Sequence, residues 1–445
     1  MTTIHKTAAG PLPPPLEPRL QARYQHLVQE HLHTSQSVAA GLQALPGTAT
    51  SFASTQAAWR FYINPDVTLA ALAQPLIEQG RAALAEVGAQ YALVLHDWSL
   101  LNYDRHTRKS DRFGQPQEHQ QGYELQSALL VSDRDGAPLA PVYQNLRSAT
   151  GLHTTRSATV QPDTTHLDEL QERWNHLDTL DLGRPLVHLI DREGDSVGHY
   201  RQWQHHHFLV RARGESKVAW AGQNLALATV AATLPTPLVF CREVQWQGQN
   251  AWQYVGETPV VLTRPARPKR RGQPPLTVAG PPVNLRLVVS EVRDAHGKVL
   301  AQWLLLSNVS ASVSAAELAL WYYWRWRIET YFKLLKSAGL QVEQWQQRSA
   351  GAVARRLWVA GAALVLVWQL ARTDSPAAAQ LRTVLVRLSG RQMKRGCLWT
   401  IPALLAGTWV LLAMLDLLEQ QDLAHVRALA AQLFKPAAQN CPQHV

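Results

Sequence analysis

The chain has 445 residues, more than one ordinary hydrophobic core serves, so we expect two or three domains. Its 46% hydrophobic and 17% charged residues exclude an intrinsically disordered chain. Lys and Arg number 43 against 33 Asp and Glu, and the resulting charge of +10 suits a polyanionic partner, either nucleic acid or an anionic membrane surface. The three cysteines, Cys241, Cys397 and Cys441, are far apart and odd in number. We therefore expect no disulfide framework, no cysteine-based zinc site and a cytoplasmic location.

The N-terminal region is predicted to be helical after a Pro-rich lead. Residues 1–18 contain the run GPLPPPLEP, have no apolar secretory-signal region and should be disordered. Residues 19–88 hold three helix-like segments, separated by Leu45-Pro46-Gly47 and Asn64-Pro65. A helical domain of this size suits DNA binding, although such bundles serve many purposes.

Residues 89–345 are predicted to form an α/β domain. A buried strand at Tyr91–Leu95 ends at His96-Asp97, and another at 185–190 ends at Asp191. Between them come a hairpin turning at residues 133–136 and a helix at 165–180. A helix at 194–204 and a strand at 208–213 follow. The pattern places acidic residues at the carboxyl ends of strands.

Two segments later in the chain allow alternatives. Residues 215–310 are mainly β, interrupted by Arg264–Arg271, which holds five cations in eight residues. A solvated loop and a phosphate-contacting loop are equally good interpretations.

Residues 396–415 are uncharged and long enough to span a membrane, but Pro402 and Gly407 favour a buried helical hairpin. The other apolar run, 357–368, is too short to span. We expect residues 346–445 to be a helical dimerisation domain.

The segment Trp321–Lys336 is the most informative one. At about 100° per residue, the side chains of Tyr322, Arg325, Glu329 and Lys336 fall within roughly 60° of one helix face. Apolar residues occupy the opposite face and should pack into a core: Trp324, Ile328, Tyr331 and Leu335. An ordinary amphipathic surface helix has the same pattern.

Three carboxylates from distant segments suggest a metal site. Taken singly, Asp97 and Asp191 could cap the next element. If they converge with Glu329, they can hold two divalent ions for phosphoryl transfer. Mg²⁺ prefers such carboxylate oxygens, and we expect that Mn²⁺ can substitute.

These residues carry a resemblance to a known family. The spacing of Tyr322, Arg325, Glu329 and Lys336 resembles the Y-R-E-K signature of the Tn-five-like branch of bacterial insertion-sequence DDE transposases (the IS-four family). The string Asp191-Arg-Glu-Gly-Asp195 is similar to that family's second-Asp motif, and Asp97 lies where its first Asp is expected. The resemblance covers roughly residues 50–345. It implies an RNase H-like catalytic domain (89–345) with a β-rich insertion (215–310), flanked by helical domains.

The resemblance also implies roles for individual residues. Asp97, Asp191 and Glu329 would be the metal-binding triad. Tyr322, Arg325 and Lys336 would contact DNA phosphates. Trp303 resembles a tryptophan that stacks on a flipped base, although a core role is almost as good an interpretation. Arg211 resembles an arginine near the active site, and Arg60 an N-terminal DNA contact; either could also be an ordinary surface cation.

A few neighbouring residues receive other expectations. Trp98 follows Asp97, where the family pattern has a small hydroxyl residue. Asp195 is expected to cap a helix, and Glu193 to support the metal ligands from behind. The run His205–His207 receives no function, because adjacent residues of a strand point in different directions.

The resemblance implies a cut-and-paste DNA transposase. It would bind terminal inverted repeats and act as a homodimer on two paired ends. It would cleave these ends through a hairpin intermediate and join the 3′-hydroxyl groups to target DNA. We expect it in the cytoplasm, on the nucleoid and without membrane contact. The principal alternative is a catalytically silent, transposase-derived DNA-binding regulator. A simple RNase H-like nuclease and a membrane-anchored protein are lesser alternatives.

Overall fold

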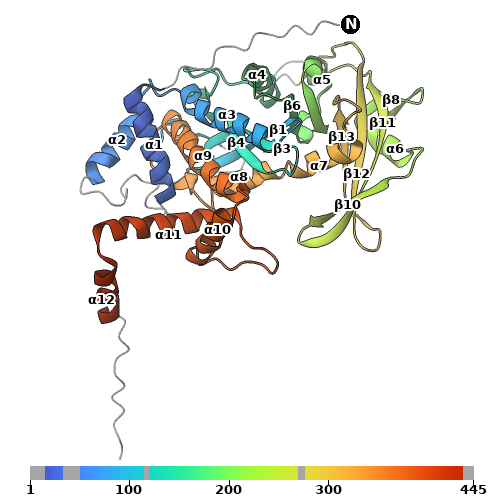
Figure 1. The fold of residues 1–445 in the computed structure, drawn as a ribbon. Coiled ribbons are helices and arrows are strands. Elements are labelled where there is room, and N and C mark those ends of the chain that lie inside the picture. Colours follow the sequence, from blue (N-terminus) through green and yellow to red (C-terminus); the bar gives the residue numbers. More distant parts are fainter. Residues whose placement is uncertain (1–15, 34–50, 115–119, 269–275, 434–445) are drawn as a thin grey trace, which may run out of the picture.

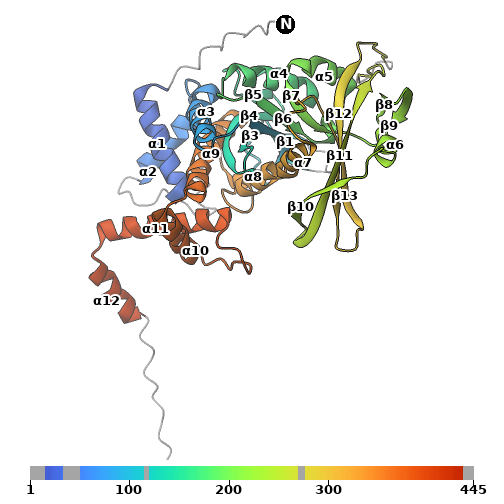
Figure 2. The ribbon, with the colours of Figure 1, turned by 45° about the vertical axis from the view of Figure 1, so that its right-hand side comes forward.

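A computed structural model describes residues 16–33, 51–114, 120–268 and 276–433 (Figure 1). The chain is a mixed α/β protein with one large mixed sheet and helices at both ends. The N-terminal and C-terminal helices gather at one end of the molecule, and the β-rich insertion lies at the other, as both ribbon views show (Figures 1 and 2).

The N-terminal region is helical, as predicted. It consists of α1 (Pro18–His33), α2 (Ser51–Ile63) and α3 (Leu69–Glu86). The side chain of Thr68 accepts a hydrogen bond from the backbone N–H of Ala71 and so caps the start of α3. Most of the Pro-rich lead and the break at Leu45-Pro46-Gly47 fall outside the described residues.

The first part of the sheet has strand order β5-β4-β3-β1-β6-β7. Strands β3 (Gln121–Ser132) and β4 (Pro138–Ser148) form the predicted hairpin, and Gly136 in its turn has φ +65°, a conformation that favours glycine. Strands β1 and β3 are antiparallel, whereas β6 and β7 run parallel to β1. The other strands of this part are β1 (Ala92–Asn102), β2 (Phe113–Gly114), β5 (Gly151–Thr154), β6 (Leu186–Ile190) and β7 (His207–Arg211).

Short helices cover the connections between these strands. The predicted helix at 165–180 is α4 (His166–Thr179), capped by the side chain of Thr165. The predicted helix at 194–204 is broken into 3₁₀ turns η2 (Arg192–Gly194) and η3 (Trp203–His205) around the short α5 (Val197–Gln202).

The β-rich insertion extends the same sheet. Strand β13 pairs antiparallel with β7, so the insertion strands continue in the order β13-β12-β11-β8-β9, and β10 pairs with β11 (Figure 2). Residues 269–275, which include the last three residues of the basic loop, lie outside the described residues. The bounds are β8 (Lys217–Trp220), β9 (Gln223–Ala226), α6 (Leu227–Ala232), β10 (Val239–Trp246), β11 (Gln249–Leu262), β12 (Val283–Arg293) and β13 (Val299–Ser307).

From Ala315 the described chain is helical, as predicted. Helix α9 packs against α1, α2, α3 and β4, so both ends of the chain share one hydrophobic core with the sheet. The bounds are α7 (Ala315–Trp324), α8 (Arg327–Leu335), η4 (Val342–Gln344), α9 (Ala350–Arg372), α10 (Pro376–Leu388), α11 (Ile401–Gln420) and α12 (Leu423–Leu433).

Two helices in the described part of the chain are long and apolar enough to cross a membrane. The run at 357–368 belongs to the 23-residue α9, so the expectation that this segment is too short is wrong; 83% of its most apolar stretch is buried, as in a core helix. Helix α11 does pair with α10, but only 28% of its apolar stretch is buried. The hairpin is therefore present, whereas the burial predicted for it is only partial.

Candidate active site

Asp97 lies within strand β1 rather than at its end. Strand β3 pairs with β1 along its whole length, from Ala92 to Asn102, and this pairing keeps β1 extended beyond the predicted end. The parallel pairing with β6 stops earlier, at Leu95 opposite Leu189. Continuing that register by two residues places Asp97 opposite Asp191. Backbones of adjacent strands lie about 4.8 Å apart, so the two aspartates start from neighbouring positions.

Asp191 follows directly after β6, as predicted. Its side chain caps η2, and its Oδ1 accepts a hydrogen bond from the backbone N–H of Glu193 at 2.9 Å. This bond fixes one carboxylate oxygen of Asp191 and leaves Oδ2 for other partners.

Glu329 comes from a helix that is interrupted, although the sequence predicts one continuous helix. Helix α7 ends at Trp324 and α8 begins at Arg327. Between them, the N–H groups of Arg325 and Ile328 each donate to the carbonyl three residues earlier, as in a 3₁₀ turn. The tightened turn buries Trp324 and exposes Trp326. The predicted core face, including Ile328, is buried as expected.

Arg325 joins the carboxylates of Asp97 and Glu329. Its side chain is buried, with Nη1 donating to Asp97 Oδ2 at 3.0 Å and Nη2 donating to Glu329 Oε1 at 2.8 Å. Charged hydrogen bonds of this kind are stronger than neutral ones. The guanidinium therefore holds Asp97 and Glu329 on the same side of β1.

The electrostatics place the charges of all three carboxylates within interaction range of one another, although among the described residues their oxygens do not form a group within 4.8 Å of one another. Burial raises the pKa of Asp97, Arg325 opposes this, and the charge of Asp191 raises it further. Burial likewise raises the pKa of Glu329 against the effect of Arg325, and both Asp97 and Asp191 add to the rise. Carboxylates that repel one another and are partly desolvated gain most from a divalent cation. The oxygen-only donor set fits Mg²⁺ or Mn²⁺.

An open cavity of about 510 Å³ lies beside these carboxylates, bounded by β1 and α8. Asp97, Glu329 and Lys336 line it, together with Lys333. The ammonium of Lys336 donates to the carbonyl oxygen of Leu100 and lies 3.5 Å from Glu343 Oε1. Two lysines at the rim of an acidic cavity suit a phosphate backbone whose reacting group enters the acidic part.

The remaining predicted DNA contacts divide into near and remote residues. Tyr322 and Trp303 are both buried, and their rings lie 5.9 Å apart in the core. Burial raises the pKa of the Tyr322 phenol, and the charges of Arg325 and of Arg211, at the end of β7, oppose this rise. Arg60 is exposed on α2, among the helices that pack on α9, and does not join the cluster.

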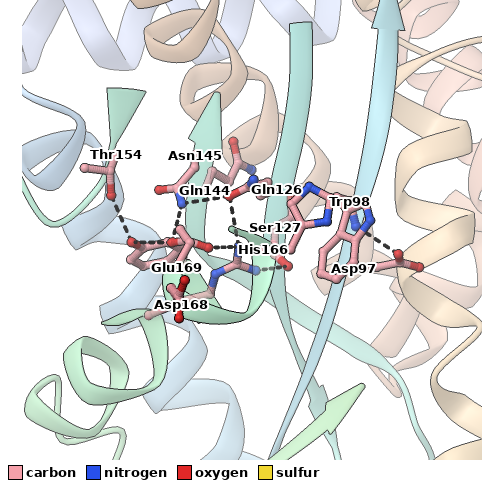
Figure 3. A network of polar contacts seen from close by, with 12 residues as sticks. Asp97, Trp98, Gln126, Ser127, Gln144, Asn145, Thr154, His166, Asp168 and Glu169 are labelled. Carbon is pink, nitrogen blue, oxygen red and sulfur yellow. Dashed lines mark hydrogen bonds and ion pairs between the residues drawn. The ribbon is translucent and has the colours of Figure 1, made fainter. Parts of the chain in front are cut away.

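The sequence gives no signal for a polar cluster behind Asp97. His166 of α4 lies between Glu124 Oε1, at 2.9 Å, and Glu193 Oε1, at 2.7 Å, and its ring packs 4.3 Å from that of Trp98. Figure 3 shows how these residues continue into the polar network of β3, β4 and α4, which includes Asn145 and Glu169. Trp98, at the position after Asp97 where the family pattern has a small residue, thus packs against the ring of His166.

The side chain of Asp195 does not cap α5, contrary to the prediction; only its backbone N–H caps the end of η2. Its Oδ2 accepts hydrogen bonds from the backbone N–H of Arg213 at 2.8 Å and from the hydroxyl of Ser216 at 2.6 Å. Asp195 therefore ties the loop after Asp191 to the loop after β7. Ser196 occupies the N-cap of α5 without a side-chain hydrogen bond.

No protein-family model and no curated protein matches this chain. The class of protein that the fold and the site support is thus argued from their geometry.

Proposed function

We propose that the chain is a DDE transposase of the Tn-five-like insertion-sequence branch, with an RNase H-like catalytic core. The observation that carries this proposal is the acidic cluster of Asp97, Asp191 and Glu329 with Arg325 between two of its members. The strand order of the first half of the sheet supports it: an antiparallel β4-β3-β1 unit is followed by two strands parallel to β1. The insertion follows β7 and returns through β13 to Glu329.

In this proposal the three carboxylates hold two Mg²⁺ ions, which Mn²⁺ can replace. Such ions activate an attacking oxygen and stabilise a leaving oxygen in phosphoryl transfer. The protein's own residues position the DNA: Lys336 and Lys333 at the cavity rim contact phosphates, and Arg325 orients Asp97 and Glu329. Tyr322 lies beside Arg325 on the core side.

The substrate would be the terminal inverted repeats of the element that encodes the chain. Two copies of the chain would pair two ends, cleave them, with a hairpin intermediate, and join the 3′-hydroxyl groups to target DNA in the bacterial cytoplasm. Stacking of a flipped base on Trp303 would require its present partners, Trp246 and Tyr322, to move aside.

The test is strand cleavage by the full chain, using duplexes taken from the DNA that flanks its gene. We expect Asp97→Asn and Glu329→Gln each to lower Mg²⁺-dependent cleavage by at least about a thousandfold, because each removes a metal ligand, while binding to the duplex persists. Glu215→Gln, which removes an exposed carboxylate outside the cluster, should cleave as the unchanged chain does. Cleavage by Glu329→Gln at the normal rate would contradict the triad.

One observation favours a second candidate, the silent DNA-binding regulator. Arg325 already forms ion pairs with both Asp97 and Glu329, so the cluster has an internal cation. A regulator would bind the flanking inverted repeats with the same affinity in Mg²⁺ and in a chelator, and the unchanged chain would cut neither strand. The cleavage experiment therefore separates the two candidates.

A further inference from the structure

A second group of metal-ligand side chains lies apart from the acidic cluster. Asp178 at the end of α4, His188 in β6 and His206 just before β7 each offer a ligand atom, and these atoms lie within 4.8 Å of one another. His206 Nδ1 is 2.7 Å from Asp178 Oδ2, and His188 Nε2 is 3.7 Å from Asp178 Oδ1. The residues are separated by ten and eighteen positions in the chain, so only the fold brings them together.

His188 is the part of this group that a plain hydrogen-bond network does not explain. Its side chain is fully buried, yet its Nε2 has no hydrogen-bond partner. The distance of 3.7 Å to Asp178 is too long for a hydrogen bond. It is close to the spacing of about 3.3 Å between two ligands of one tetrahedral zinc ion. Buried polar atoms are normally satisfied, so this orphaned nitrogen points to a missing partner.

The surroundings hold both imidazoles in place for coordination. His188 Nδ1 lies 2.9 Å from His96 Nε2, and the ring of His188 stacks on Trp174 at 4.4 Å. His206 Nε2 lies 3.2 Å from Asn175 Oδ1, which accepts a hydrogen bond from the Nε2–H group, and Nδ1 of His206 faces Asp178. Partners of this kind on the far ring nitrogen are typical of metal-binding histidines.

We propose that His188 Nε2, His206 Nδ1 and one oxygen of Asp178 bind a single transition-metal dication, of which Zn²⁺ fits the donor set best. Two imidazoles and one carboxylate make a common zinc ligand set. Asp178 is 39% exposed, which gives the ion a route from solvent and leaves room for water as a fourth ligand. The ion would take the place of the proton shared by His206 and Asp178, and these two atoms would separate by a few tenths of an ångström.

The position of the site suggests what the ion does. It would join α4 to β6 and to the start of β7, and His96, which supports His188, precedes Asp97 in β1. His188 lies in β6, three residues before Asp191, which follows directly after that strand. A bound ion would therefore stiffen the two strands that carry the aspartates of the proposed active site, without itself touching the DNA.

The experiment measures Zn²⁺ binding by the full chain without a histidine tag, after chelator treatment and in millimolar Mg²⁺. We expect one Zn²⁺ per chain, a higher Tm with Zn²⁺ than with Mg²⁺ alone, and at least about tenfold weaker binding in Asp178→Asn and in His206→Gln. Co²⁺ in the same site should give the visible absorption of a tetrahedral ion. His296→Ala, which removes an exposed histidine in a distant turn, is the matched control.

Two outcomes would overturn the proposal: no Zn²⁺ binding that survives dialysis, or equal Zn²⁺ affinity in Asp178→Asn and the unchanged chain. Asp178→Asn is nearly isosteric at a half-exposed position, so we expect it to fold; Zn²⁺ dependence of the Tm of the unchanged chain gives a readout that needs no variant. Asp97→Asn should keep its zinc. Loss of zinc from Asp97→Asn would place the ion in the acidic cluster and also contradict the proposal.

Discussion

Arg325 illustrates how a single buried charge organises the candidate site. A guanidinium that is only 7% exposed is tolerable because both of its terminal nitrogens donate to carboxylates. Like charges on Asp97, Asp191 and Glu329 would otherwise repel one another in a partly desolvated space. Arg325 stabilises the cluster before a metal ion binds. Once a metal ion is bound, Asp97 and Glu329 must interact with both the metal ion and Arg325.

His166 makes the stability of the protein depend on pH. Burial alone would lower the pKa of His166, but hydrogen bonds to Glu124 and Glu193 outweigh it and raise the pKa to about 9. Because this value lies above that of the unfolded chain, near 6.5, the contribution is complete below pH 6.5 and is lost as the pH rises through about 9. We expect this contribution of His166 to the free energy of unfolding to fall by roughly 2 kcal/mol across this window. Lys109, whose pKa burial lowers to about 7, contributes with the opposite sign over the same range, so the effect of His166 is the difference between the unchanged chain and a His166 variant.

Urea unfolding at about pH 6.5 and about pH 9 measures the effect. His166→Gln keeps a polar side chain that does not titrate, so the stability advantage of the unchanged chain over this variant should shrink by about 2 kcal/mol between the two conditions. Arg147, near Glu124, stays charged throughout the range and does not contribute. An equal loss of stability in His166→Gln would show that another group is responsible.

At the scale of elements, close backbone approach decides how α10 and α11 pack. A Cβ atom built on Gly407 would lie 2.0 Å from the carbonyl oxygen of Leu385 in α10. Gly407→Ala must therefore push the two helices apart, and we expect a loss of about 2–3 kcal/mol despite the better helix propensity of alanine. Thermal unfolding and protease cleavage of the connection between α10 and α11 report it.

The matched control is Gly198→Ala in α5. There the new methyl group would meet only the Cβ of Ala266 at 3.5 Å, an ordinary contact. This variant should be unchanged or slightly more stable. If the two variants unfold alike, the close approach of α11 to α10 does not govern their packing.

At the scale of the whole molecule, α11 presents an apolar face that the other described residues leave uncovered. Its large hydrophobic side chains at i, i+4 and i+7/i+8 spacing are between 36% and 47% exposed: Val410, Met414, Leu417 and Leu418, with Leu415 beside them. Faces of this kind mark interaction surfaces. The proposed dimer gives this face a partner of matching chemistry.

We therefore expect the full chain to sediment as a dimer, and the double substitution Leu415→Glu/Leu418→Glu to sediment as a monomer, because two buried charges without partners oppose association. Val160→Glu, at a position that is 45% exposed elsewhere, should remain dimeric. A monomeric unchanged chain at micromolar concentration would exclude dimerisation through α11, and its sedimentation with lipid vesicles would assign the face to a membrane.

The helices and strands followed from local patterns, because hydrophobic periodicity and turn residues act over a few neighbours. The hairpin around Gly136, helix α4, strand β6 and the helical ends were all predictable for this reason. The boundaries that failed depend on distant partners. Strand β1 runs past Asp97 because β3 pairs with it, and α7 separates from α8 where Trp324 enters the core.

The sequence alone determined which residue types could form an acidic site, since the spacing in Trp321–Lys336 and the aspartates after apolar runs are visible in one dimension. Only the tertiary structure decided that Arg325 bonds both Asp97 and Glu329, that Trp98 packs on His166, and that His188 faces Asp178 and His206. Apart from the bond between Arg325 and Glu329, which are four positions apart, these contacts join residues 10 to 228 positions apart. Sheet register and helix packing determine these distances, and neither can be predicted from a short segment of the sequence.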